Sequence, residues 1–186
     1  MSAAGHIDPS NKKIALLIAL LALVLAISET LGKSAQTSAL SYNIEASNLW
    51  AFFQAKTIRL TVVRTAAEAA QLDAPAAAGE ARAARDKQID AWKKTAARYD
   101  SEPETNEGRK ELAARAKAAE EKRDRSLAAY HHYEVASGAV QVGIVLASAA
   151  IITTVMALAW IGAGLGVVGL GFMVIGLVAP TAVHLF

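Results

Sequence analysis

The sequence contains no cysteine, and its last 52 residues, 135–186, contain no Asp, Glu, Lys or Arg. The first absence excludes a disulfide framework, a thiol nucleophile and a cysteine metal site. The second is what a lipid environment produces, because hydrocarbon excludes ions. The mean hydropathy of +0.30 is high for a chain of 186 residues and agrees with this interpretation.

Recognisable catalytic motifs are also missing. We find no nucleophile elbow, phosphate-binding loop, HExxH motif or supported Ser/His/Asp arrangement. Residues 33–134 carry basic and acidic side chains in near balance, so no basic stripe indicates nucleic-acid binding. The sequence therefore predicts a protein that is not an enzyme, needs no cofactor and has no nucleic-acid partner.

Three segments are apolar enough to span a membrane. After an N-terminal tail (1–10), residues 11–32 contain an unbroken apolar run from Ile14 to Ile27 and form the predicted first span. A cleaved signal peptide is the alternative, but no small-x-small cleavage site follows the run. The charge-free C-terminal segment is long enough for two further spans, 135–156 and 160–182, with a turn between Thr153 and Gly164.

The middle segment, 33–134, is predicted to be an extramembrane helical coiled-coil domain. Apolar residues recur there at alternating steps of four and three, and only Lys56 is charged. The positions are Ala35, Ala39, Tyr42, Ala46, Leu49, Phe53, Lys56, Leu60, Val63, Ala67 and Ala70. Because alanine buries little area, this seam predicts packing against further copies or another protein. The alternative is a loose hairpin that the membrane anchors alone hold together.

Breaks in the pattern divide the middle segment into three helices. Pro75 and Gly79 end the first, a second runs to about Tyr99, and residues 100–108 form a turn. A third helix begins near Arg109 and continues into the second span without a break.

Helix lengths do not fit a strict up-down-up path, since the first helix is much longer than the second. We therefore expect the first helix to bend or unwind between Gly32 and Ser41. Residues 42–70 should then pair with the third helix and bring Phe53 or Leu60 close to residues 112–127.

Small residues form stripes on the two C-terminal spans. In lipid such stripes let helix backbones approach closely, so we expect them to face each other or a second protomer. The predicted helix-packing residues are Ala139, Gly143, Ala147, Gly162, Gly166, Gly169 and Gly176.

Three polar residues near the predicted membrane boundary are weak site candidates. Glu29 is the one acidic residue in an apolar run, which suggests an intramembrane polar site or proton pathway, although pairing with Lys33 also explains it. His131 and His132 suggest metal binding, but adjacent helix positions point about 100° apart. The alternative is an interfacial belt with Tyr130 and Tyr133.

Trp50, Phe52 and Phe53 cluster on an otherwise polar helix. The seam explains Phe53 but explains the other two only in part. We therefore interpret the three rings as a contact with a partner or a second copy.

Two segments resemble a known bacterial family. They are ETLGKSAQT (29–37) and NIEASNLWAFFQAKTIR (43–59), and the family is the domain of unknown function 4337. The resemblance extends over nearly the whole chain and implies an inner-membrane protein with three spans and no established activity. It also implies basic residues between the last two spans, which this chain lacks.

Together these observations predict an all-α membrane protein with three transmembrane helices and an extramembrane helical hairpin inserted between the first and second. The predicted function is a membrane-anchored scaffold, either a homo-oligomer or an accessory subunit of a larger membrane complex. The alternative is an oligomeric channel or transporter-like pore that uses Glu29, Ser34, Gln36, Thr37 and Ser41. Lys12 and Lys13, with the resemblance, favour a cytoplasmic N-terminus and a periplasmic hairpin in the bacterial inner membrane.

Overall fold

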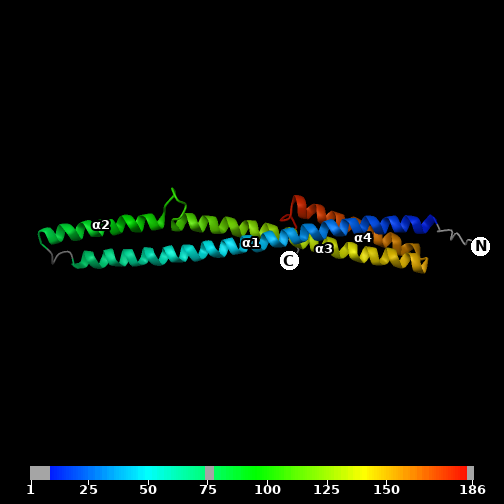
Figure 1. Cartoon of the computed structure of the whole chain (residues 1–186), viewed down its shortest axis with the longest axis horizontal. Helices are drawn as coiled ribbons and strands as arrows, with labels where there is room; N and C mark the ends of the chain where they lie inside the picture. Colours follow the sequence, from blue (N-terminus) through cyan, green and yellow to red (C-terminus); the bar gives the residue numbers. More distant parts are fainter. Residues whose placement is uncertain (1–8, 74–77, 184–186) are drawn as a thin grey trace, which may run out of the picture. The chain divides into compact units, whose positions relative to one another are not determined.

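The structure is a computed structural model, and it describes residues 9–73 and 78–183. In these residues it has four helices and no strand: α1 (Pro9–Asp73), α2 (Glu80–Asp100), α3 (Arg109–Thr153) and α4 (Met156–Val178) (Figure 1). Of these, α1, α3 and α4 are long and apolar enough to cross a membrane. The all-α class is therefore confirmed.

The chain forms two compact units, which we name by their composition. The apolar unit comprises residues up to Leu40 and from Arg123 onward, and the charged unit comprises Ser41–Lys122. Both α1 and α3 contribute to each unit. The prediction that the third helix runs into the second span without a break is confirmed by α3.

We predicted that α1 bends or unwinds between Gly32 and Ser41. The unwinding is wrong, because α1 is helical throughout this stretch, and the bend stays a prediction. The reason lies in its buried face, which we call the inner stripe. The alternating spacing of four and three residues that defines the coiled-coil seam continues through the predicted first span. The same face of α1 is therefore buried along its whole length, and nothing favours a break in the helix. Every member is buried or half-buried: Ile14, Ile18, Leu21, Leu25, Ser28, Gly32, Ala35, Ala39, Tyr42, Ala46, Leu49, Phe53, Lys56, Leu60, Val63, Ala67 and Ala70.

The charged unit does not follow an up-down-up path. Figure 1 shows α2 and the start of α3 one after the other along α1, both antiparallel to it. Arg64 and Ala67 of α1 border one groove with Trp92 and Ala96 of α2. The chain therefore does not reverse direction at loop 101–108, and α2 and the start of α3 together form the segment that runs back along α1. Because their lengths add, they match the length of α1 in this unit.

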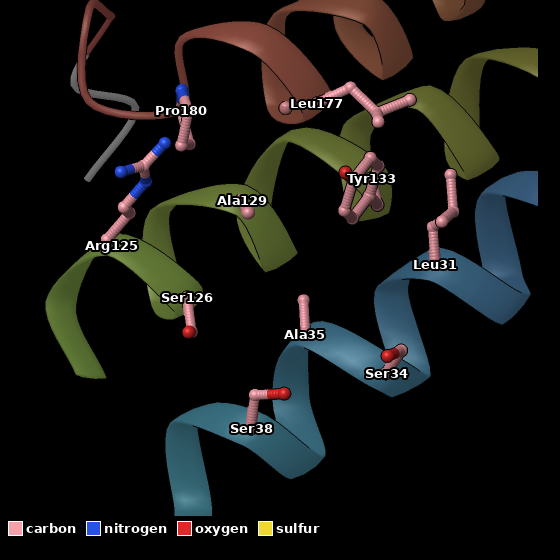
Figure 2. Close-up of a pocket in the computed structure, with 11 residues that line it drawn as sticks. Leu31, Ser34, Ala35, Ser38, Arg125, Ser126, Ala129, Tyr133, Leu177 and Pro180 are labelled. Atoms are coloured by element: carbon pink, nitrogen blue, oxygen red, sulfur yellow. The ribbon is translucent and has the colours of Figure 1, made fainter. Parts of the chain in front are cut away.

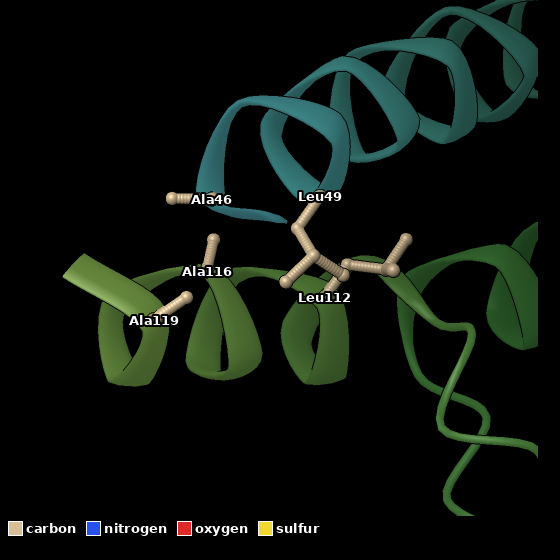
Figure 3. Close-up of a cluster of buried hydrophobic side chains, with 5 residues drawn as sticks. All are labelled: Ala46, Leu49, Leu112, Ala116 and Ala119. Atoms are coloured by element: carbon tan, nitrogen blue, oxygen red, sulfur yellow. The ribbon is translucent and has the colours of Figure 1, made fainter. Parts of the chain in front are cut away.

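Packing between α1 and α3 in the charged unit involves small apolar side chains. Ala46 and Leu49 form a buried cluster with Leu112, Ala116 and Ala119, as Figure 3 shows. Phe53 packs against this cluster, so its predicted approach to residues 112–127 is confirmed.

The apolar unit is a bundle of α1, α3 and α4. Near the N-terminal end of α1, Ile14 packs with Ala147, Ala150 and Ala159 of the other two helices. The turn between α3 and α4 is shorter than predicted, because α4 begins at Met156 and not near residue 160. Trp160 therefore lies within α4, where it is exposed.

Candidate functional site

Close backbone contacts hold α3 against α4. A β-carbon on Gly162 would lie 2.6 Å from the carbonyl oxygen of Gly143, and one on Gly143 would lie 2.8 Å from that of Gly162. Gly169 fits against Val140 and Ala136 in the same way. The structure therefore places the two predicted stripes opposite each other within one chain.

The other predicted packing residues contact different helices of the apolar unit. Gly166 faces Leu21 of α1, and Gly176 faces Tyr133 and His132 of α3. Ala147 is fully buried in the cluster around Ile14, whereas Ala139 is only half-buried.

His132 is almost fully buried and attaches the end of α4 to α3. Its Nε2 lies 3.0 Å from the carbonyl oxygen of Pro180, so this nitrogen carries the proton and donates. The ring stacks on Phe172, 6.1 Å between centroids. His131 points elsewhere, with Nδ1 3.7 Å from a carboxylate oxygen of Glu134. The structure therefore does not bring the two histidines to one point.

Metal binding gains no support from the surrounding residues. No group of three or more His, Cys, Asp or Glu side chains in residues 9–73 and 78–183 is arranged to hold a metal ion.

Glu29 lies on the exposed surface of the apolar unit. Gln141 donates a hydrogen bond from Nε2 to Glu29 Oε1, 3.2 Å away. The two residues border a groove of about 470 Å³ that also includes Lys33, Glu134 and Ser137. This groove thus faces outward between α1 and α3 and is bordered mainly by polar residues.

The aromatic residues predicted as a contact surface differ in exposure. Trp50 donates from Nε1 to Glu120 Oε1 at 2.9 Å and meets Phe53 edge to face. Packing inside the chain therefore accounts for these two rings. Phe52 is 37% exposed and is the ring that remains available to a partner.

Lys56 forms a charge cluster that was not among the predicted sites. Its side chain is only 7% exposed, and Nζ lies 3.8 Å from Glu102 and 3.9 Å from Glu107. Nζ also lies over the rings of Phe52 and Tyr99, at 5.5 and 5.4 Å from their centroids. The signal was present in the sequence, because Lys56 is the one charged member of the inner stripe and loop 101–108 is rich in Glu.

The same loop is closed by Glu111, in the first turn of α3. Ser101 Oγ donates to Glu111 Oε1 at 2.6 Å, and the Glu102 backbone N–H donates to Oε2 at 3.1 Å. These hydrogen bonds lower the pKa of the Glu111 carboxyl. Lys110 lowers the pKa of Asp100 through a hydrogen bond and its charge. Gly108 is required here, since any β-carbon would collide with the Glu102 backbone.

Comparison with known proteins identifies a family but no activity. Neither a curated protein nor a solved structure matches this chain. A family model described as a domain of unknown function (DUF4337) matches residues 10–179, which covers all four helices almost completely. The chain therefore belongs to the DUF4337 family.

Proposed function

We propose that this protein is a membrane-anchored helical scaffold that assembles with copies of itself through the outer face of α1. The observation that carries the proposal is an exposed, uncharged row of residues, which we call the outer stripe. Its members, all exposed, are Ser41, Ile44, Asn48, Ala51, Ala55, Ile58, Val62, Thr65, Ala69 and Leu72.

Large apolar side chains on this stripe are mostly exposed. Ile58 is 65% exposed, Val62 is 62% exposed and Leu72 is 82% exposed. By contrast, α2 and the first half of α3 carry many Lys, Arg, Asp and Glu residues, most of them exposed. The charged outer faces of α2 and α3 are therefore typical of a surface in contact with water, whereas the apolar side chains of the outer stripe are typical of a protein interface.

The outer stripe has the spacing of a second coiled-coil seam. It repeats at alternating steps of three and four and is displaced by two residues from the inner stripe, which places it about 160° around the helix. A helix that is apolar on two opposite sides is typical of the centre of a bundle. One side of α1 is covered by α2 and α3, and the other is available.

A second copy is the occupant that these features favour. Copies anchored in one membrane with one orientation must pair in parallel, so each stripe residue would meet its own equivalent. An uncharged stripe can do so without repulsion. Asn48 would occupy a core position where a polar residue aligns parallel helices. The stripe is about 47 Å long at 1.5 Å per residue, enough for several heptads of contact.

The test uses single cysteines, which the cysteine-free chain permits without background. We expect Ile44→Cys and Ile58→Cys to form disulfide-linked dimers in native membranes. Lys117→Cys, on the exposed face of α3, should form few. Ile58→Glu should move the full-length protein to a smaller species in native mass spectrometry. Monomers throughout, with no cross-link at either stripe position, would contradict the proposal. Cross-links to a different protein would instead identify an accessory subunit of a larger complex.

An oligomeric channel is the second candidate, because the polar groove around Glu29 faces outward from the apolar unit. Covered by a second copy, this groove would place Glu29, Lys33 and Gln141 along a shared polar path. Liposomes containing the full-length protein should then conduct cations, and Glu29→Gln should reduce the flux. Flux equal to that of empty vesicles would count against a channel.

For location we propose the bacterial inner membrane, with the three candidate spans in the bilayer. Lys12 and Lys13 precede the first span and favour a cytoplasmic N-terminus. The charged unit would then lie in the periplasm, since long domains are translocated largely regardless of their charge.

A further inference from the structure

A cavity lies in the apolar unit where α1, α3 and the end of α4 converge, and its volume is about 250 Å³. Figure 2 shows Ser38 and Ser126 directing their hydroxyl groups into the space between α1 and α3. Arg125 lies at the rim, beside Pro180. Polar groups from two helices therefore line one cavity.

The hydroxyl groups of this cavity are free to bind a ligand. Elsewhere on these helices, Thr37 and Ser148 donate to a carbonyl four residues earlier. Among residues 9–73 and 78–183, no hydrogen bond involves the hydroxyls of Ser34, Ser38 or Ser126, all of which line the cavity.

Arg125 is likewise a cation without a partner. Its neighbour Arg123 forms an ion pair with Asp124, 2.8 Å from guanidinium to carboxylate. Arg125 is exposed, and no carboxylate of the described residues lies within ion-pair distance of it. A cavity lined by a guanidinium and by free hydroxyls is suited to a phosphate group, which accepts two parallel hydrogen bonds from arginine.

The rest of the cavity lining is mainly apolar and includes Leu31, Ala129 and Leu177. Leu31 lies near the end of the predicted first span, and Leu177 lies one residue before the end of α4. If the spans lie in a bilayer, the cavity opens at the level of the lipid headgroups, with charge on one side and hydrocarbon on the other.

We propose that this cavity is a binding site for an anionic phospholipid. The Arg125 guanidinium pairs with the lipid phosphate, and the Ser38 and Ser126 hydroxyls donate to its remaining oxygens. The first carbons of an acyl chain contact Leu31 and Leu177. The site needs the spans to be embedded in a membrane, but it does not depend on self-assembly.

The test is native mass spectrometry of the full-length protein titrated with phosphatidylglycerol and, separately, with phosphatidylcholine. We expect phosphatidylglycerol to be retained, and Arg125→Gln to weaken its binding at least fivefold. Arg123→Gln removes the same charge two residues away and should weaken binding less than twofold. The double variant Ser38→Ala/Ser126→Ala keeps every charge and should also lose affinity.

Three results would overturn the proposal. They are an equal loss for Arg125→Gln and Arg123→Gln, equal retention of phosphatidylcholine, and displacement of the lipid by millimolar inorganic phosphate. The last would identify a site for free phosphate. Unchanged thermal unfolding of each variant by circular dichroism shows that the comparison concerns binding and not folding.

Discussion

At the scale of single residues, Lys56 combines two roles that can be separated by mutation. Its ammonium group lies near Glu102 and Glu107 and over the rings of Phe52 and Tyr99, while its stem is buried on the inner stripe. Long lysine side chains often contribute through their apolar stems as well as their charge. Because both glutamates are partly exposed, the charge contributes less than in a fully buried pair.

We expect Lys56→Ala to lower the free energy of unfolding by about 1–3 kcal/mol, since it removes packing and charge together. Lys56→Met keeps the stem and should cost only about 0–1 kcal/mol. Arg59→Ala, on an exposed position of the same helix, should change stability by less than about 0.5 kcal/mol. Urea unfolding followed by circular dichroism checks all three, and an equal effect of Lys56→Ala and Arg59→Ala would contradict this account.

Gly162 is a second residue whose substitution should lower stability, because there is no room for a side chain at its position. A side chain there must displace the Gly143 carbonyl, so we expect Gly162→Leu to destabilise the α3–α4 contact by about 1–3 kcal/mol. Gly171, on the same helix, has nothing within 4 Å of its β-carbon position and is the matched control. Thermal unfolding in detergent should show a lower midpoint for Gly162→Leu and little change for Gly171→Leu. Similar midpoints for the two variants would show that the close approach is unimportant.

At the scale of elements, loop 101–108 should make the charged unit sensitive to acid. The folded-state pKa of Glu111 is lowered from its ordinary value of 4.5, and that of Asp100 from 3.8. The two ionised carboxylates therefore stabilise the fold at any pH above their ordinary pKa values. This stabilisation is lost as the pH falls through their lowered folded-state pKa values, because the carboxylates are then protonated. We expect the urea midpoint to fall as the pH drops below about 4.5.

The variant Glu111→Gln tests whether Glu111 causes the sensitivity to acid. It should be less stable than the natural protein at pH 7, and its urea midpoint should depend less on pH between 5 and 3. Ser101→Ala, which removes the hydroxyl donor to Glu111, should change the pH dependence in the same direction. A pH profile that both substitutions leave unchanged would exclude Glu111 as the acid-sensitive group.

Sequence periodicity predicted the helices well because burial in this fold follows one repeat. The seam from Ala35 to Ala70 predicted the buried face of α1, and the same step in Ile14–Gly32 could have excluded unwinding. The direction of α2 relative to α3 could not be predicted, since a nine-residue break fits a reversal and an interruption equally well. The cavity beside Arg125 depends on three helices that meet only in the folded chain, so no local pattern indicates it.

At the scale of the whole molecule, the three candidate spans would place the two ends of the chain on opposite sides of a membrane. If the proposed orientation is right, Thr105→Cys in the charged unit should react with a membrane-impermeant maleimide once the outer membrane is opened. Asp8→Cys should react only after the inner membrane is disrupted. The reverse labelling pattern would show a cytoplasmic charged unit, and labelling of both positions before disruption would exclude the three-span topology.

The inner stripe has a consequence for how the chain avoids folding errors. Ala39 and Ala46 lie one heptad apart on the inner stripe, so sliding α1 along α3 by one heptad, about 10 Å, would place one alanine where the other had been. Lys56 breaks this degeneracy, because a misaligned chain would bury its ammonium without a carboxylate. Its carboxylates are synthesised roughly fifty residues later. During translation, α1 therefore has one side chain that can accept only the correct partner segment.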